Sequence, residues 1–367
     1  MGLRDRYRQL PPNPFRSHRR DVLVGMAGAV ITGMEAVSGA IRRVRLPGET
    51  DRTRLLRLAA RQVVAHDENV VALTFVAADG APLPRWHPGA HIDVHLPSGL
   101  LRQYSLCGEP ESQDSYRIAV RCIPDGGGGS IEMHGLEIGD TVTTHGPRNA
   151  FPLTVPGYGS PMKEFRFVAG GIGITPILPM LALAERLGVD WSMVYAGRSR
   201  DSLPFIEELS RFGDRIEIRT DDVSGVPTAA GLLGDCPDGT TVYACGPAPM
   251  LTAIRAALVG RDDVELHFER FAAPPVVDGR AFSATVASTG QEIAVGADET
   301  LLAALRRANV EAPYSCQQGF CGTCRTRVVS GVVDHRDTLL TAPERDGGLM
   351  LVCISRAATG ERLTLDL

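Results

Sequence analysis

The sequence has little of several features that would assign it to a narrow class of proteins. It contains no internal repeats and no low-complexity tract, and its formal net charge of −5 does not indicate general nucleic-acid binding. No signal peptide precedes its eight cysteines, and four of these are scattered, which argues against a disulfide framework and favours a reducing cytoplasm. A length of 367 residues with 44% apolar content then predicts a globular protein of two to three domains.

The other four cysteines lie near the C-terminus with the spacing C-x4-C-x2-C, followed by one cysteine alone. They are Cys316, Cys321, Cys324 and Cys353. This is the plant-type [2Fe–2S] spacing, and Gly319 and Gly322 between the ligands can take positive φ and let the loop fold tightly. Four thiolates also suit zinc, but zinc sites usually pair two short C-x2–4-C knuckles. The spacing therefore predicts an iron–sulfur cluster and one-electron transfer.

The hydrophobic pattern predicts a multidomain protein. Residues 1–50 form a basic extension with an expected helix, and residues 51–157 contain short strands between turn signals, typical of an antiparallel β-barrel. Residues 158–271 alternate strands and helices, which predicts an α/β nucleotide-binding domain with a parallel sheet. A turn-rich linker, residues 272–280, precedes a small α+β unit around the cysteines, residues 281–367.

The same hydrophobic pattern predicts where the individual strands and helices lie. Barrel strands are expected at residues 55–64, 71–77, 90–96, 102–106, 116–122 and 141–144. In the nucleotide-binding domain, strands are expected at residues 165–169, 193–196, 215–219 and 241–244, and helices at residues 176–187, 205–212 and 249–259.

A motif in the barrel suits a flavin. Tyr104 can supply an aromatic wall, Ser105 a hydrogen-bond donor near the reactive edge, and Arg102 a phosphate contact, with Gln103 inside the same motif. The alternative is that Tyr104 and Ser105 are simply residues of an ordinary β-sheet, where Tyr and Ser often alternate. Downstream, a glycine run ending in Gly128, Gly129 and Ser130 exposes several N–H groups and could bind a phosphate, while a flexible hairpin loop remains the alternative.

A second glycine-rich segment directly follows a strand and opens a helix. Gly171 and Gly173 allow close approach to a pyrophosphate at the helix N-terminus, and Thr175 and Pro176 complete the segment. This is not the G-x-G-x-x-G fingerprint, and the acid expected about twenty residues later is missing, so the site is a variant nucleotide site.

Two later segments belong to the same site. Cys245, Gly246 and Pro247 stand at the carboxyl edge of the sheet, where ligands bind, although Cys245 could also be a buried small apolar residue. Arg198 and Arg200 follow the second strand and could bind the 2′-phosphate of NADPH. The alternative is that Arg198 packs over the adenine, which is compatible with NADH.

These motifs together resemble the phthalate dioxygenase reductase family over about residues 53–367. The resemblance implies an FMN barrel, an NAD(P)H domain and a C-terminal plant-type ferredoxin domain of the β-grasp type. It implies that Arg102, Gln103, Tyr104 and Gly128 to Ser130 hold FMN rather than FAD, and that Gly171 to Pro176 and Cys245 to Pro247 hold the nicotinamide coenzyme. It assigns catalytic positions to Ser105, Cys245, Glu269 and Phe271, the last as a ring covering the flavin.

The expected function is an NAD(P)H-dependent reductase that passes electrons through FMN and the cluster to a partner oxygenase, of Rieske or haem-thiolate type. The chain is also similar to the reductase portion of self-sufficient haem-thiolate monooxygenases. Two alternatives stay open at this point. One is a reductase of a small soluble acceptor, and the other is a four-cysteine zinc or redox-sensing protein without flavin.

The basic extension falls outside the family pattern. Residues 22–41 carry one charge, Glu35, and four glycines, with arginines on both sides. The length could span a bilayer, but Glu35 would be costly there and the glycines weaken the hydrophobicity. We therefore expect a helix that contacts this protein or its twin, a partner, or a membrane surface, which would make the protein cytoplasmic or peripheral at the membrane.

Overall fold

The computed structural model describes residues 12–13, 16–20, 30, 52–65, 67, 70–124, 128–154, 162–271, 276–314, 317–319 and 322–367. The chain divides into two compact units, residues 1–51 and residues 52–367. In the first unit, β1 (Pro12–Asn13) pairs antiparallel with β2 (Arg16–Arg20), and Val30 is helical. The rest of the helix expected over residues 22–41 lies outside the described residues. Within the described parts of the chain, no helix combines the length and apolar character needed to cross a bilayer.

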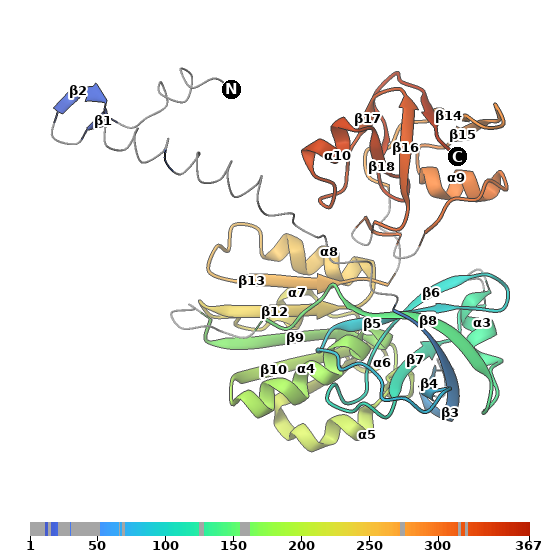
Figure 1. Ribbon diagram of the computed structural model, residues 1–367. Helices are drawn as coiled ribbons and strands as arrows, with labels where there is room; N and C mark the ends of the chain where they lie inside the picture. Colours follow the sequence, from blue (N-terminus) through green and yellow to red (C-terminus); the bar gives the residue numbers. More distant parts are fainter. Residues whose placement is uncertain are drawn as a thin grey trace. The chain divides into compact units, whose positions relative to one another are not determined.

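The second unit begins with an antiparallel sheet that curls into an open half-barrel (Figure 1). Its strands are β3 (Thr53–Ala65), β4 (Val70–Ala77), β5 (Ala90–His95), β6 (Leu101–Ser105), β7 (Tyr116–Arg121) and β8 (Thr141–Asn149). The strand order β6-β5-β8-β3-β4-β7 leaves β6 and β7 at the two edges. All six predicted barrel strands are present, and alternation sends Ile92 and Val94 into the core while His91 and Asp93 face the other side.

One element of this domain was not expected. The glycine run leads into a short helix, α3 (Gly129–His134), which packs near β7. Met133 and Leu136 are buried in the half-barrel core, so an apolar anchor holds a segment whose glycines suggested only a loop. Glu132 in this helix accepts hydrogen bonds from the N–H and hydroxyl of Ser98, in the turn that precedes β6.

The nucleotide-binding domain is a parallel sheet of order β11-β10-β9-β12-β13. The strands are β9 (Glu164–Gly170), β10 (Asp190–Gly197), β11 (Ile216–Thr220), β12 (Thr240–Cys245) and β13 (Glu265–Glu269). The order reverses between β9 and β12, and this switch point is where open α/β sheets bind ligands. The four predicted strands are confirmed. The strand β13 was not expected, because its charged residues obscure the apolar pattern that indicates a strand.

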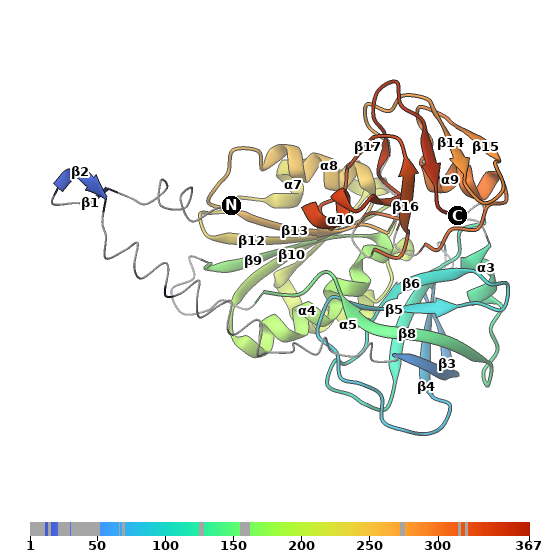
Figure 2. The same cartoon turned by 45° about the horizontal axis from the view of Figure 1, so that its top comes forward.

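Helices cover both faces of this sheet. Figures 1 and 2 show α4 (Ile174–Leu187) on one face and α8 (Ala248–Ala257) on the other, with α7 (Ala229–Leu233) beside α8. The shorter elements are the 3-10 helices η1 (Gly171–Gly173), η2 (Arg200–Ser202) and η3 (Ser210–Arg215) and the helices α5 (Ile206–Leu209) and α6 (Asp221–Ser224). The helix predicted over residues 205–212 is therefore split between α5 and η3.

The half-barrel and the parallel sheet share a hydrophobic core. Ala72 and Ala119 from the half-barrel belong to the same buried cluster as Ile174 and Leu178 of α4. Phe205, before α5, lies in this cluster as well. Burial of this apolar surface holds the two domains in one arrangement.

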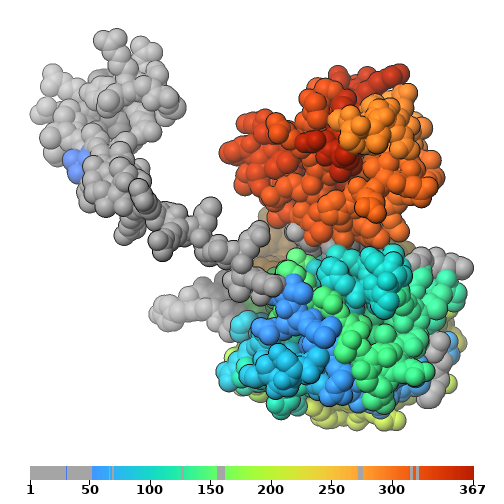
Figure 3. Space-filling view, turned by 45° about the vertical axis from the view of Figure 1, so that its right-hand side comes forward, coloured from blue at the N-terminus to red at the C-terminus, as the bar shows by residue number. Residues whose placement is uncertain are grey.

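Within the second unit, residues from 282 onward form an α+β domain with a core of its own, the orange-to-red lobe in Figure 3. Its main sheet has the order β15-β14-β20-β16-β18, and β17 pairs with β19. The strands are β14 (Phe282–Val286), β15 (Glu292–Val295), β16 (Arg325–Ser330), β17 (Val333–Asp334), β18 (Leu349–Leu351), β19 (Arg356–Ala357) and β20 (Leu363–Leu365), and the helices are α9 (Leu301–Arg307) and α10 (Ala342–Asp346). Leu301, Leu305 and Met350 lie at the centre of its own core.

Candidate functional site

The strand β6 presents its motif on two faces. Tyr104 pairs with Ile92 and Arg102 with Val94 across β5, so Arg102 and Tyr104 share one face. Tyr104 packs against the half-barrel core, and burial raises the pKa of its hydroxyl, which therefore stays protonated. Ser105 ends the strand on the opposite face and is 6% exposed. An aromatic ring and a neighbouring arginine thus line the open edge of the sheet.

The glycines before α3 leave room for Arg102. A Cβ atom on Gly129 would lie 2.5 Å from Arg102 Nε, and Gly128 takes φ +84°, so both positions suit glycine. Ser130 Oγ accepts a hydrogen bond from the Ile123 N–H at 3.0 Å and donates to the Ile123 carbonyl at 3.2 Å. Ser130 therefore fastens this loop to the chain that follows β7, and the guanidinium of Arg102 lies against the start of the helix, a cradle that fits a phosphate.

Gln103 turns away from this cradle. Its Nε2 donates to Asp93 Oδ1 at 2.9 Å and lies 3.3 Å from His91 Nε2. Arg148 donates to the other oxygen of Asp93. Burial lowers the pKa of His91 to about 4, so the ring is neutral near pH 7. Gln103 thus holds β6 to β5 through a buried polar cluster.

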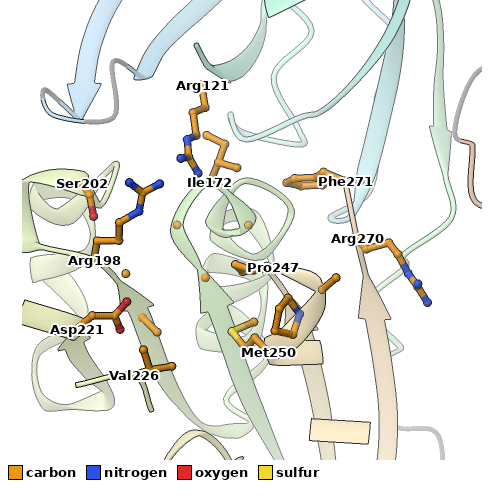
Figure 4. A pocket seen from close by; sticks show the side chains of 18 of the residues that line it. Arg121, Ile172, Arg198, Ser202, Asp221, Val226, Pro247, Met250, Arg270 and Phe271 are labelled. Carbon is orange, nitrogen blue, oxygen red and sulfur yellow. The ribbon is translucent and has the colours of Figure 1, made fainter. Parts of the chain in front are cut away.

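A cavity of about 710 Å³ opens at the switch point of the parallel sheet (Figure 4). Figure 4 shows Arg198, Ser202 and Asp221 on one side of it and Pro247, Met250 and Phe271 on the other. Its lining also includes Val70, Arg121 and Ile123 of the half-barrel and Gly170 to Gly173 at the end of β9. The cavity therefore extends from the coenzyme half of the sheet toward the flavin domain.

Close approach of three segments requires glycine in this cavity. A Cβ on Gly173 would lie 2.2 Å from the Cys245 carbonyl oxygen, and one on Gly170 would lie 2.6 Å from Pro247 Cδ. A Cβ on Gly246 would lie 2.4 Å from Met250 Cε. A side chain at Gly170 or Gly173 would collide with the segment from Cys245 to Pro247, and one at Gly246 would displace Met250, so these glycines let β9, β12 and α8 pack closely around the cavity.

The cavity includes some predicted residues and omits others. Those that line it are Gly171, Gly173, Arg198, Gly246, Pro247 and Phe271. Among the described residues, Thr175, Pro176, Arg200 and Cys245 do not. Thr175 is buried and its hydroxyl donates to the Ile172 carbonyl at 3.1 Å, so it stabilises the turn into α4. Arg200 lies in η2 and is exposed.

Sequence reasoning missed several lining residues. Asp221 follows β11 directly, and its position at the carboxyl end of a parallel strand was the available signal. The Asp222 N–H donates to the Arg198 carbonyl at 3.0 Å, which ties the two strand ends together. Arg121 and Ser202 come from different domains, and no local pattern marks their convergence.

A half-buried acid, Glu269, stands beside the cavity. Cys245 and Glu269 pair in register on β12 and β13, next to the lining residues Gly246 and Arg270. Burial raises the pKa of Glu269 to about 8, and its Oε2 is buried with no hydrogen-bond partner. Burial also raises the pKa of the Cys245 thiol well above its usual value, with the Glu269 charge adding to the effect. Both groups are therefore protonated near neutral pH.

Two of the four predicted cluster ligands can be described. Cys324 and Cys353 are buried at 2% and 1% exposure, and the Val352 N–H donates to the Cys324 carbonyl at 3.3 Å. Cys316 and Cys321 lie outside the described residues. The expected positive φ is confirmed at both intervening glycines, +85° at Gly319 and +74° at Gly322. A Cβ on Gly319 would lie 2.9 Å from Ile354 Cγ2, so the ligand loop packs directly beside Cys353.

The ligand loop also contacts the nucleotide-binding domain. The side-chain amide of Gln318, two residues after Cys316, donates a hydrogen bond to the backbone carbonyl of Arg270. Arg270 precedes Phe271 and lines the coenzyme cavity. The chain thus brings a thiolate-bearing loop, a dinucleotide cavity and an aromatic flavin strand into one unit.

These features define a flavin- and pyridine-nucleotide-dependent oxidoreductase with an attached ferredoxin domain. A sequence model described as a 2Fe-2S iron-sulfur cluster binding domain matches residues 284–358. The chain is 40% identical over 318 residues to the phenoxybenzoate dioxygenase subunit beta of Ectopseudomonas oleovorans, covering 85% of this chain and 97% of that protein. It is 41% identical over 320 residues to the vanillate O-demethylase oxidoreductase of a Pseudomonas species, covering 84% and 98%.

Solved structures agree. The phthalate dioxygenase reductase structure has a TM-score of 0.63 at 32% identity and covers 86% of this chain and 98% of its own. The structure of full-length CYP116B46 from Tepidiphilus thermophilus has a TM-score of 0.62 at 39% identity, and the match covers 91% of this chain and 45% of that chain. The chain belongs to the phthalate dioxygenase reductase family, and its cofactors are FMN, a [2Fe–2S] cluster and NAD(P)H.

Proposed function

We propose that this chain is the reductase of an oxygenase system, delivering electrons from NAD(P)H to a separate oxygenase protein. The observation that carries the proposal is the single unit that holds the β6 flavin edge, the coenzyme cavity and the cysteine-bearing domain. When bound, the flavin exchanges electron pairs with the nicotinamide and the cluster carries single electrons. Anaerobic addition of NADH or NADPH, followed at flavin and cluster wavelengths in the wild type and in a variant lacking one ligand cysteine, tests this function.

The residues of the half-barrel bind and orient the flavin. Tyr104 supplies the ring wall and Ser105 a polar group at the end of β6. Arg102 and the start of α3, from Gly128 to Ser130, hold the phosphate, and the contact between Arg102 and Gly129 supports this role. Gln103 acts behind the strand through Asp93. Four cysteines, Cys316, Cys321, Cys324 and Cys353, hold the cluster.

The residues of the nucleotide-binding domain hold the coenzyme. Gly171 borders open space at the cavity where the pyrophosphate would lie, and Gly173, Gly246 and Pro247 form the closely packed wall beside it. Phe271 lines the cavity and is 47% exposed, and its ring can cover the flavin beside the nicotinamide position. Cys245 and Glu269 border the nicotinamide end, and a protonated Glu269 can donate to the carboxamide.

A pH dependence follows from Glu269. Its pKa is about 8 when folded against the usual 4.5, so between these values the folded state holds a proton that the unfolded chain has lost. Stability therefore falls as pH rises from about 4.5 to about 8, by at most about 1.4 kcal/mol per pH unit for one group. Glu269→Gln should lack this contribution, so its urea midpoint relative to the wild type should rise between pH 5 and pH 8.5.

Glu207→Gln is the matched control, because Glu207 is an exposed glutamate in α5 of the same domain. Its midpoint should follow the wild type at both pH values. If the urea midpoints of wild type and Glu269→Gln instead changed in parallel between pH 5 and pH 8.5, Glu269 would be ionised in the folded protein over this range.

Coenzyme preference depends on Asp221 and Arg198. A carboxylate at the end of β11 can accept hydrogen bonds from ribose hydroxyls and repel a 2′-phosphate. Arg198 lines the same side of the cavity and suits either adenine packing or a phosphate contact. We infer that Asp221 decides the balance in favour of NADH, and that Arg200, which is exposed in η2, has little part in it.

We also propose that residues 1–50 aid docking to a partner, a second copy or a membrane surface. This segment carries nine arginines and only four acidic residues, and residues 52–367 form a compact unit without it. Deleting residues 1–48 should leave NAD(P)H reduction of FMN and of the cluster unchanged while altering oligomer size, vesicle co-sedimentation or partner turnover. Loss of FMN, or no change in all three properties, would contradict this role.

A further inference from the structure

Tyr195 is a buried polar residue with no assigned role in the coenzyme site. It lies on β10, pairs in register with Ala169 of β9, and is fully buried. Its hydroxyl oxygen is 3.0 Å from the carbonyl oxygen of Gly171 and 3.0 Å from that of Pro204. The single hydroxyl proton is therefore shared between two backbone carbonyls that are 33 residues apart in the sequence.

The first carbonyl belongs to the coenzyme loop. Gly171 opens η1 with φ +53° and lines the cavity, and its carbonyl also accepts from the Ile174 N–H. In a planar trans peptide the C=O and the following N–H point in opposite directions. Because Tyr195 and Ile174 hold the Gly171 carbonyl toward the protein interior, the Ile172 N–H is directed to the cavity side, and Ile172 lines that cavity.

The second carbonyl belongs to the joint between the two domains. Pro204 precedes Phe205, a non-glycine residue with φ +64° whose ring lies 5.0 Å below the Arg117 guanidinium. Arg117 comes from β7 of the half-barrel and pairs with both carboxylate oxygens of Glu208 in α5, at 2.7 Å and 2.9 Å. Tyr195 thus connects the coenzyme loop to the residues that fasten the flavin domain.

We propose that Tyr195 is a positioning residue for coenzyme binding, which orients the Gly171–Ile172 peptide so that the loop receives the pyrophosphate. This inference rests on the proposed function of the cavity as the coenzyme site. It gives a role to a hydroxyl that lies in a largely apolar cluster with Phe167 and Leu203. A phenylalanine there would pack equally well but would leave both carbonyls one partner short.

Tyr195→Phe tests the proposal. The loss of one hydrogen bond is small beside the stability of a domain, so the variant should fold and keep FMN. Calorimetric titration of the oxidised protein with NAD+ and NADP+ should show binding about five- to tenfold weaker than in the wild type. In rapid reduction by NADH, the apparent KM should rise by a similar factor, with the rate at saturation changed much less.

Tyr116→Phe is the matched control. Its buried hydroxyl donates to the Pro84 carbonyl at 2.7 Å inside the half-barrel, so the variant loses the same kind of bond away from the coenzyme loop. Its melting temperature should fall as in Tyr195→Phe, while coenzyme binding stays at the wild-type value. Equal coenzyme affinity in Tyr195→Phe and Tyr116→Phe would overturn this inference but leave the proposed function standing. A wild type that binds neither nucleotide would overturn the proposed function and this inference with it.

Discussion

Replacing Cys353 with serine is expected to abolish electron delivery to the oxygenase and leave NAD(P)H reduction of bound FMN intact. Cys353 is 1% exposed beside Cys324 in the core of the C-terminal unit, so a serine there cannot complete four thiolate ligands. The flavin edge and the coenzyme cavity are built from other domains and keep their contacts. Anaerobic rapid-mixing spectra should show full flavin bleaching without a cluster signal, and oxygenase turnover should fall to background.

Cys236→Ser is the matched control for this change. Cys236 is also buried, at 6% exposure, but lies in the nucleotide-binding domain away from the ligand spacing. It should retain about two irons per chain and normal turnover, as a plant-type cluster requires. Zinc in place of iron in anaerobically prepared wild type, or loss of flavin reduction in Cys353→Ser with FMN still bound, would refute the proposed order of electron flow.

Asp221→Ser is expected to shift coenzyme preference toward NADPH, raising kcat/KM for NADPH relative to NADH about ten- to a hundredfold. The change removes a negative charge from the cavity wall where a 2′-phosphate would lie, next to Arg198. It also removes the acceptor for the ribose hydroxyls, so the value for NADH should fall. Steady-state reduction of ferricyanide with each coenzyme measures the ratio.

Asp222→Ser provides the control, because Asp222 carries the same charge one residue later but is exposed and outside the cavity lining. Its coenzyme ratio should stay near that of the wild type. An equal shift in both variants would indicate a long-range charge effect. An unchanged ratio in Asp221→Ser would reject the assigned role.

Local chemistry made much of the fold and site predictable. Short strands between turn signals predicted an antiparallel barrel, which the structure has as an open half-barrel. Gly173 and Gly246 lie where protein segments approach closely, whereas Gly171 borders open space and takes φ +53°. The cysteine spacing predicted a cluster, in agreement with the matched 2Fe-2S domain, because ligand geometry restricts where thiolates can stand in one loop.

The rest depended on contacts between distant segments. Asp221 lines the cavity only because β11 lies beside β10. Tyr195 can position the coenzyme loop only because the carbonyls of Gly171 and Pro204 both lie within hydrogen-bond distance of its hydroxyl. Arg200 had the right charge two residues from Arg198, but the turn into η2 leaves it outside the lining. The helix α3 was missed because its glycine-rich start hides an apolar anchor at Met133.

The shared core of the two N-terminal domains affects how this protein can be divided. Ala72 and Ala119 of the half-barrel bury their surface against α4, whereas the C-terminal unit completes a core from its own residues. Separating the first two domains would expose apolar surface on both, while a cut between Phe271 and Phe282 would leave both cores covered. We therefore expect the flavin and coenzyme domains to be exchangeable as one part and the ferredoxin domain as another, with hybrid reductases joined between these two residues.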